Sequence, residues 1–420
     1  MQLRSFLGKI EVSEFEEIIE IDHLAKIIKD RDEAPTLYKV KEYQAKILAG
    51  IITDRESVSL GLDTTKENII PNIIKKLDYL KPYDIKDSAP FLKNQIQLDS
   101  ENTIDRHLPV IDFYAGKKYT TSSVVIIDYP DENRQNASFH RMMHISQNKF
   151  SIRIVAQRHL DNAYQHAVKS GKDLNVAVVF GIHPAIEIAS AFSAPELDEL
   201  ELASSFLNGL DVFRLPNGIL VPSESEFVIE ARITSDLANE GPFIDLTGTA
   251  DRVRKQPILV ADTLYFRDDP IFRTILPGGK EHKMLMGIPQ EPRIFKAVSN
   301  TIPTVKNVVL TQGGCSWLHA VVQIEKRTEG DPKNAILASL AAHPSLKRVI
   351  IVDEDIDLTD PNEVEWAVAT RFQADTDLIL VPKSKGSSLD PSSKDSITCK
   401  YGMDATKPIT NNEEFNKAGF

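Results

Sequence analysis

Hydrophobic and polar positions follow three different patterns along the 420-residue chain. In the first hundred residues, apolar side chains recur at near-helical spacing through residues 11–30 and again through 67–80, which predicts two amphipathic helices. Short apolar runs at 36–40 and 45–53 predict strands. The first helix would bury one apolar stripe, made of Phe15, Ile18, Ile19, Leu24 and Ile27. This part of the chain is typical of a small α/β lobe.

From about residue 108 the pattern becomes that of strands. Turn-rich loops separate five runs of β-branched or alternating residues, which cover 122–128, 150–155, 174–181, 225–233 and 257–266. One helical pattern over 194–209 interrupts them and ends at an Asn-Gly pair. A β-rich middle domain with a barrel-like sheet follows from this pattern.

After about residue 292, buried-type strands alternate with helical patterns. The strands are predicted at 307–312, 319–326, 348–357 and 377–382, and the helices at 334–343 and 362–372. Such alternation is typical of a βαβ sheet. The fold class is therefore α/β, α+β overall, in three parts: residues 1–105, 106–292 and 293–420.

Composition narrows the class of protein. With 49 Lys and Arg against 61 Asp and Glu, the net charge is −12, which argues against nucleic acid or an anionic membrane as a partner. The two cysteines, Cys315 and Cys399, exclude a disulfide framework and a thiolate zinc site. The early acidic residues argue against a signal peptide, and no apolar window reaches 18 residues. We therefore expect a soluble protein of the cytoplasm.

The well-known catalytic signatures are missing. The chain has no GxGxxG, GxxxxGK[ST], GxSxG or HExxH run, so dispersed groups must carry any chemistry. Asn136 and His159 offer an amide oxygen and an imidazole to a hard divalent ion. Arg141, Arg153 and Arg158 suit bidentate binding of phosphate or carboxylate. The alternative for this segment is a turn followed by a solvated basic strand.

Two further groups are acidic. Glu240 and Asp245 flank a Gly-Pro turn and can converge on one cleft, where an arginine between them would separate their pKa values, with an exposed turn as the alternative. Glu199 and Glu201 stand in the first turn of the helix predicted over 194–209. Acids there usually favour the helix dipole, and metal ligation is the alternative.

Taken together, these segments resemble the UbiD family of prenylated-FMN-dependent decarboxylases. Five motifs occur in the order found in that family: N-x-x-x-x-R at 136–141, E-G-P-F-x-D at 240–245, and the runs at 266–287, 352–372 and 386–406. The likeness covers roughly residues 105–410 and is loose in the N-terminal lobe.

The resemblance implies a central split-barrel-like flavin domain and a C-terminal α/β domain for oligomers, as a dimer or hexamer. It implies prenylated FMN, supplied by a flavin prenyltransferase, with Mn²⁺ and a K⁺ ion as a further candidate. Carried over to this sequence, the metal ligands are Asn136, His159 and Glu199, with Glu201 as the alternative to Glu199. The implied cofactor contacts are Phe139, His140, Arg141, Arg153, Ile154, Val155, Arg158, His159 and, at the phosphate, Lys400.

Arg141, Glu240 and Asp245 resemble the family's catalytic network, although some members have Glu at the last position. Loss of CO₂ from an sp² carbon leaves charge that plain side chains cannot stabilise, so the flavin must accept it. Arg141 would orient the substrate carboxylate, Glu240 would tune Arg141, and Asp245 would deliver the proton.

The expected partner is a small unsaturated carboxylate. Arg158, which stands where the family often has Gln, and a cluster of Lys280, His282 and Lys283 favour a phosphorylated acid. The resemblance, which extends to short archaeal members of the family, implies trans-anhydromevalonate 5-phosphate as the substrate, which would yield isopentenyl phosphate and CO₂. The alternatives are an aromatic acid such as a 4-hydroxybenzoate derivative, or a non-catalytic flavin-binding subunit, which would have no need of the Arg141 network.

Overall fold

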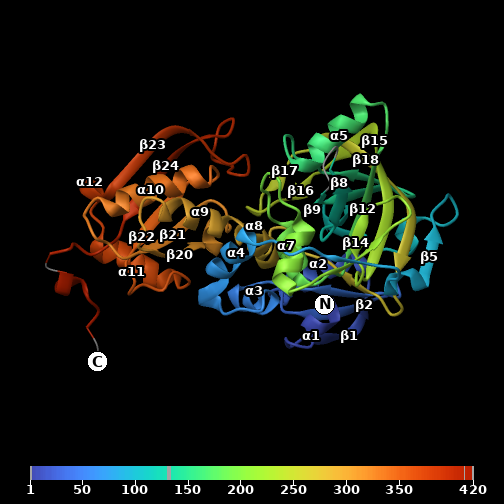
Figure 1. Cartoon of the computed structure of the whole chain (residues 1–420), viewed down its shortest axis with the longest axis horizontal. Helices are drawn as coiled ribbons and strands as arrows, with labels where there is room; N and C mark the ends of the chain where they lie inside the picture. Colours follow the sequence, from blue (N-terminus) through green and yellow to red (C-terminus); the bar gives the residue numbers. More distant parts are fainter. Residues whose placement is uncertain (1, 130–133, 411, 419–420) are drawn as a thin grey trace. The chain divides into compact units, whose positions relative to one another are not determined.

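The computed structural model describes residues 2–129, 134–410 and 412–418, and the chain divides into two compact units, residues 1–285 and 286–420 (Figure 1). Each unit has its own hydrophobic core. Among the described residues, no helix is both long enough and apolar enough to cross a bilayer.

The first sheet of unit 1 joins strands from distant parts of the sequence. Its order is β1 (Ser13–Ile19), β2 (Thr36–Val40), β3 (Lys46–Ala49) and β19 (Ile271–Arg273). β1 and β2 are parallel, β2 and β3 antiparallel, and β19 is parallel to β3. The strand predicted over 36–40 is therefore confirmed, and the one predicted over 45–53 is confirmed for residues 46–49 only.

The helix predicted over residues 11–30 is wrong in its first half. Residues 13–19 form β1, and α2 (Ile21–Asp30) begins directly after it. Phe15 and Ile19 are four residues apart, a spacing that places two side chains on one face of a strand as well as of a helix. Pairing with β2 selects the strand, where Phe15 packs on Tyr38 with ring centroids 5.6 Å apart and Ile18 stays exposed.

A ten-stranded antiparallel sheet forms the centre of unit 1. Its order is β6-β7-β10-β11-β18-β15-β12-β8-β9, and β5 pairs with the C-terminal end of β18, residues 263–266. The strands are β5 (Asn94–Gln97), β6 (Ile111–Tyr114), β7 (Lys117–Thr120), β8 (Val124–Asp128), β9 (Gln135–Phe139), β10 (Met142–Ser146), β11 (Lys149–Ile152), β12 (Leu174–Phe180), β15 (Phe227–Glu240) and β18 (Arg254–Phe266). All five predicted strand runs are confirmed here. Their apolar faces pack on α2 and α5 (His159–Lys169) in one core.

Shorter elements surround this sheet. A hairpin of β16 (Phe243–Ile244) and β17 (Ala250–Asp251) follows β15, and a three-stranded sheet joins β4 (Asp84–Lys86), β13 (Asp211–Arg214) and β14 (Leu220–Pro222). The helices are α1 (Leu3–Leu7), α3 (Arg55–Gly61), α4 (Ile69–Asp78), α6 (Pro184–Ser190), α7 (Glu199–Leu207) and α8 (Lys280–Gly287). The predicted helices over 67–80 and 194–209 are confirmed as α4 and α7, and α7 ends at Asn208 in the left-handed conformation.

Unit 2 is a sheet covered by helices. Its order is β20 (Val305–Leu310), β21 (His319–Ile324), β22 (Arg348–Val352), β24 (Ile397–Asp404) and β23 (Leu378–Lys385). β21, β22 and β24 run parallel, and the two outer strands are antiparallel to their neighbours. The helices are α9 (Gln290–Ser299), α10 (Asp331–Ala342), α11 (Pro361–Arg371) and α12 (Ala374–Asp377). This confirms the predicted strands and helices of the C-terminal part.

Strand β24 was not predicted from the polar end of the sequence. It enters between β22 and β23, and Gly402 is directly opposite Val349. A Cβ atom on Gly402 would lie 2.1 Å from Cγ2 of Ile336, so this position requires glycine for α10 to approach the sheet.

The mixed α/β fold class is thus confirmed. The three-part division at residues 105 and 292 stays a prediction. Residues 1–105 share three sheets with later residues of unit 1, through β3 with β19, β4 with β13 and β5 with β18.

Candidate active site

Arg141 lies in the short connection between β9 and β10, and three carboxylates surround its guanidinium. Its Nε donates to Oε1 of Glu240 at 2.9 Å and its Nη2 to Oε2 of the same carboxylate at 3.0 Å. Nη1 donates to Oδ2 of Asp245 at 3.0 Å. The structure therefore brings together the three residues predicted to be catalytic, one from the β9–β10 connection and two from the end of β15 and the hairpin after it.

The third carboxylate, Asp251, was missed from the sequence. Its Oδ2 accepts from Nη2 of Arg141 at 2.7 Å and from Nη1 of Arg254 at 2.6 Å, and its Oδ1 accepts from Nη2 of Arg254 at 2.5 Å. The sequence signal was the Thr-Gly-Thr turn at 247–249, which returns the chain and sets Asp251 opposite Phe243. A hairpin prediction there would have placed Asp251 beside the motif.

Two aromatic rings complete the surroundings of Arg141. The Arg141 Cζ atom lies 4.3 Å from the centroid of the Phe243 ring, whose centroid is 4.7 Å from that of Tyr119. The Tyr119 hydroxyl donates to Oε1 of Glu240 at 3.0 Å. Burial, reinforced by the charge of Glu240, raises the pKa of Tyr119, so this hydroxyl keeps its proton and remains a donor.

The electrostatics of the site fix the charge on its arginine. Burial alone would lower the pKa of Arg141, but the hydrogen bonds and charges of Glu240, Asp251 and Asp245 raise it above the ordinary value. Burial would raise the pKa of Asp251, but the bonds from Arg254 and Arg141 outweigh it and hold the pKa at about 2. Arg141 and Asp251 are therefore both charged near neutral pH.

The predicted metal ligands also meet. Nδ2 of Asn136, on β9, is 3.0 Å from Nδ1 of His159 at the start of α5, and it donates to Oε2 of Glu199 at 3.0 Å. Glu199 is 1% exposed, and its Oε1 has no hydrogen-bond partner among the described residues. Burial raises the pKa of this carboxyl to about 8.

An amide oxygen, an imidazole and a carboxylate suit a divalent ion such as Mn²⁺. A cation would satisfy the buried Oε1 atom, and half a turn of the Asn136 amide would place its oxygen where its nitrogen now faces Glu199 and His159. These three residues therefore fit a metal ion. Among the described residues there is no cluster of three His, Cys, Asp or Glu side chains, and here the third ligand is an amide.

The alternative ligand, Glu201, lies on α7 as well but is half-buried, and its backbone N–H bonds to Asp198. Asp198 caps the helix and also accepts from the N–H of Gln135, which ties α7 to β9. This tie explains why Glu199, and not Glu201, faces Asn136.

Most of the predicted cofactor contacts lie on two adjacent segments, 139–141 and 153–155. Nδ1 of His140 donates to the carbonyl of Arg153 at 2.8 Å, and burial lowers the pKa of His140 to about 4, which keeps its ring neutral. Ile154 is buried and Val155 is 47% exposed. Phe139 is half-buried at the end of β9.

Arg153 carries a charge with no carboxylate bonded to it among the described residues. Burial, together with the nearby charges of Arg254 and Arg141, lowers its pKa. Its Nη1 donates to the carbonyl of Ile154 at 2.5 Å. An anion would relieve this repulsion, so the segment suits a phosphate.

Two further predicted contacts, Arg158 and Lys400, have partners of their own. The exposed Arg158 donates to Oγ of Ser193 at 3.0 Å. Lys400 belongs to unit 2, where its Nζ donates to the carbonyl of Pro344 at 2.6 Å and burial lowers its pKa. The roles of both residues stay predictions.

Of the cluster at 280–283, His282 is the residue whose pKa responds to the charge of Asp245. Burial lowers its pKa, the charge of Asp245 raises it, and the charges of Arg141 and Lys283 lower it further. The N–H of Gly278 donates to Nδ1 of His282 at 3.0 Å, so Nε2 carries the proton of the neutral ring. Lys280 instead pairs with Asp32 at 2.5 Å.

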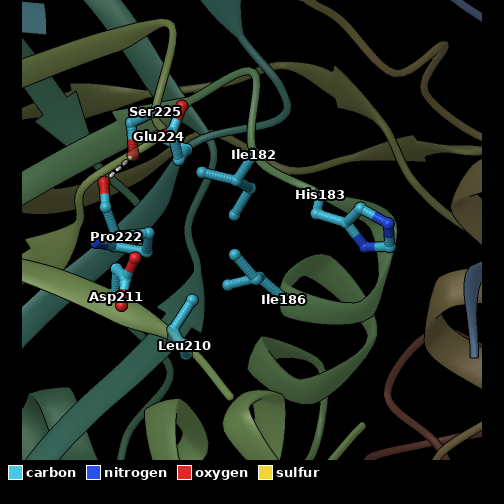
Figure 2. A pocket seen from close by; sticks show the side chains of 8 residues that line it. All are labelled: Ile182, His183, Ile186, Leu210, Asp211, Pro222, Glu224 and Ser225. Carbon is cyan, nitrogen blue, oxygen red and sulfur yellow. Dashed lines mark hydrogen bonds between the residues drawn. The ribbon is translucent and has the colours of Figure 1, made fainter. Parts of the chain in front are cut away.

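A separate recess near the start of α6 is not part of this site. Figure 2 shows that it lies between α6 and the strands β13 and β14, and it is lined by Ile182, His183, Ile186, Leu210, Asp211, Pro222, Glu224 and Ser225. Its volume of about 10 Å³ is space for about one water molecule and far too little for a flavin.

Comparison with known proteins defines the class. Residues 84–280 match the family model of the 3-octaprenyl-4-hydroxybenzoate carboxy-lyase Rift-related domain, and residues 283–405 match that of the corresponding C-terminal domain. The anhydromevalonate phosphate decarboxylase of Methanocaldococcus jannaschii is 46% identical over 400 residues, which are 94% of each chain.

Two solved structures of the UbiD-class enzyme HmfF from Pelotomaculum thermopropionicum are also similar. The complex with FMN has a TM-score of 0.95 and 32% identity, covering 100% of this chain and 97% of that one. An evolved dimeric form with prFMN has a TM-score of 0.92 and 30% identity, with the same coverage. Fold, site and these matches define a carboxy-lyase. The chain belongs to the UbiD family, which confirms the resemblance of its motifs.

Proposed function

We propose that the chain decarboxylates trans-anhydromevalonate 5-phosphate to isopentenyl phosphate and CO₂, with prenylated FMN as cofactor. The observation that carries decarboxylation is the Arg141 guanidinium held between Glu240 and Asp245. The substrate is supported by the relative from Methanocaldococcus jannaschii, whose name specifies anhydromevalonate phosphate.

Each residue of the network has a separate task. Four of the five N–H groups of Arg141 bond to protein carboxylates, and the remaining Nη1 hydrogen is directed to the substrate carboxylate. Glu240, fixed by Tyr119, holds the guanidinium plane. The bond from the sp² carbon to the carboxyl group breaks as CO₂ leaves, and Asp245 delivers a proton to that carbon.

The flavin, when bound, supplies the acceptor for the electron pair that CO₂ leaves behind. Segments 139–141 and 153–155 would hold it, and Arg153 would face its phosphate. Asn136, His159 and Glu199 would hold Mn²⁺ as the anchor of that phosphate, with K⁺ as an additional ion. The HmfF structures are complexes with FMN and with prFMN, which supports a flavin as the cofactor of this chain.

The phosphate of the substrate needs cations beyond Arg141. Lys283 on α8 supplies such a charge, and the neutral ring of His282 beside it can donate its Nε2–H to the phosphate. Lys280 is a poorer candidate than the sequence indicated, since Asp32 already neutralises it.

The test is an anaerobic assay of the chain produced with a flavin prenyltransferase. The cofactor mass is measured first, and trans-anhydromevalonate 5-phosphate is then added, with the unphosphorylated acid and a 4-hydroxybenzoate derivative as comparison substrates. We expect isopentenyl phosphate from the first substrate alone. Turnover of the aromatic acid, or equal turnover with and without the phosphate, would overturn the proposed substrate.

The metal assignment makes a distinct prediction. Glu199→Gln removes the carboxylate charge at the buried Oε1 atom while keeping a side chain of the same size, so we expect loss of most bound manganese and flavin. Glu201→Gln, on the same helix, is the matched control and should keep both. Metal analysis and the flavin absorbance of the purified chains check this. Equal retention by both variants would contradict the assignment of Glu199.

We also expect the chain to form homo-oligomers in the cytoplasm and to receive its flavin from a flavin prenyltransferase. The evolved form of HmfF is described as dimeric, which supports an assembly of more than one copy. Light scattering of the purified chain measures this directly.

A further inference from the structure

Asp251 is held in place by the hairpin that also carries the catalytic acids. In β15 and β18, Glu240 pairs with Arg254, and in the hairpin beyond them Phe243 pairs with Asp251. Asp245 lies beyond these pairs, at the turn of the hairpin, and its N–H donates to the carbonyl of Thr249 at 3.0 Å. One closed loop of chain thus fixes three carboxylates and one arginine.

The contacts of Asp251 connect two arginines. Its Oδ2 atom accepts from both Arg141 and Arg254, and its Oδ1 atom accepts a second bond from Arg254 and one from the N–H of Arg252 at 2.9 Å. The side chain of Asp251 is only 15% exposed, and those of Arg141 and Arg254 are 11% and 21% exposed. Water therefore screens this connection weakly.

Asp251 and Asp245 share the charge of Arg141 but bond to different nitrogens. Asp245 takes Nη1, whereas Asp251 takes Nη2. When Asp245 holds the proton that it will donate, its attraction for Arg141 is weakened. Glu240 and Asp251 then keep the guanidinium where it is.

We propose that Asp251 is a positioning residue. It holds the Nη2 end of Arg141, while Arg254 holds Asp251 from the other side. This arrangement determines how strongly the positive charge of Arg141 stabilises the ionised form of Asp245. This inference rests on the proposed function in one respect, that Asp245 is the proton donor. The geometry of the Asp245–Arg141–Asp251–Arg254 chain does not depend on the substrate.

Other charged groups face Asp245 and enter the expected result. Arg141 bonds to it from the β9–β10 connection, and the charge of Asp245 acts on His282 of α8, on which Lys283 also acts. Glu240 and Asp251 contribute negative charge across Arg141, and the positive charge of Arg153, after β11, acts on Arg141 and on these two carboxylates. Neither variant below changes His282, Lys283 or Arg153, so their influence on Asp245 stays constant.

Opposite shifts distinguish this role from a purely structural one. Asp251→Asn removes a negative charge that now offsets the positive charges of Arg141 and Arg254. Ionised Asp245 is then stabilised more strongly, so the titration midpoint of Asp245 should fall by about one pH unit. Arg254→Gln removes positive charge and turns Asp251 fully toward Arg141, so the midpoint should rise. The double variant should return close to the parent value.

The midpoint is measured by ¹³C NMR of the full-length chain labelled at the aspartate carboxyl carbons, with Asp245→Asn to assign the signal. This readout needs neither flavin nor substrate. In the loaded enzyme, the alkaline limb of kcat/KM should follow the same order, lower for Asp251→Asn and higher for Arg254→Gln, because the donor must be protonated. Asp262→Asn, which breaks the surface pair with Arg232, is the matched control and should leave the midpoint unchanged.

Unchanged midpoints in both single variants, or shifts of the same sign, would overturn the positioning role of Asp251. If Asp251→Asn does not fold, Arg254→Gln alone decides through the sign of its shift. Opposite NMR shifts without turnover of the proposed substrate would keep the positioning role and reject only the proposed function.

Discussion

Asp245→Asn is expected to abolish turnover while the flavin stays bound. The asparagine carboxamide keeps one acceptor oxygen, which can still accept the N–H of Leu246 that Oδ1 of Asp245 accepts at 2.7 Å, and it loses the Oδ2 atom that accepts from Arg141 at 3.0 Å. Glu240 and Asp251 still hold Arg141 in place. It has no proton to give to the carbon that loses CO₂. General acid catalysis contributes about 10²–10⁴-fold, so kcat should fall by at least that factor.

Two measurements separate chemistry from binding in this variant. Flavin absorbance and manganese content should match the parent, since no predicted cofactor contact includes Asp245. Asp245→Glu is the conservative control and should keep partial activity, because it displaces the carboxyl by one methylene. Parent-like activity of Asp245→Asn would sink the assignment of the proton donor.

The largest loss of stability is expected for Arg273→Met. Arg273, on β19, is completely buried between two carboxylates that are each 1% exposed, Glu187 and Glu281. Its Nε atom is 3.4 Å from Oε1 of Glu187, and its Nη2 pairs with Glu281. Removing the only guanidinium between them leaves uncompensated buried charge, which costs about 3–5 kcal/mol in the free energy of unfolding.

The loss should depend on pH. Burial, with the charge of Glu281, raises the pKa of Glu187 to about 7 from its ordinary value of 4.5, although Arg273 opposes this. The folded state thus binds this proton more tightly than the unfolded state, so the stabilising contribution is full below about pH 4.5 and is lost as pH rises through 7. Without Arg273 the defect should be smaller at pH 5 than at pH 8.

Urea unfolding at the two pH values measures this effect. Arg232→Met is the control, because Arg232 pairs with Asp173 and Asp262 near the surface, and such pairs contribute about 0–1 kcal/mol. Equal losses for the two variants would show that burial of Arg273 is not what matters.

The sequence patterns predicted most elements because their signals are local. The strand runs of the ten-stranded sheet and the helix α7 depend on residues within one element. The pairing of β3 with β19 and the entry of β24 between β22 and β23 are set by distant partners, and no periodicity reports them. The strand β1 was predicted as a helix for a related reason. The spacing of Phe15 and Ile19 fits both a helix and a strand, and only pairing with β2 distinguishes the two.

The same distinction explains the site. Arg141, Glu240 and Asp245 lie in short motifs. Asn136 and His159 were candidate ligands by residue type, and the family resemblance joined Glu199 to them. Asp251 was missed because its partner Arg141 is 110 positions earlier in the chain and its own neighbourhood resembles an ordinary polar turn. Lys280 shows the converse, since its charge is visible in the sequence but its pairing with Asp32 is not.

The pairing of β19 with the edge of β3 has a consequence for the synthesis of the chain. Ile271 pairs with Lys46 and is translated about 225 residues later, which at about 5–20 residues per second is about 10–45 seconds. Throughout that interval the outer edge of β3 has no partner of its own, and an open strand edge is a template for neighbouring nascent chains. The yield of soluble protein will therefore depend on keeping this edge covered on the ribosome, and slower translation lengthens the time for which chaperones must do so.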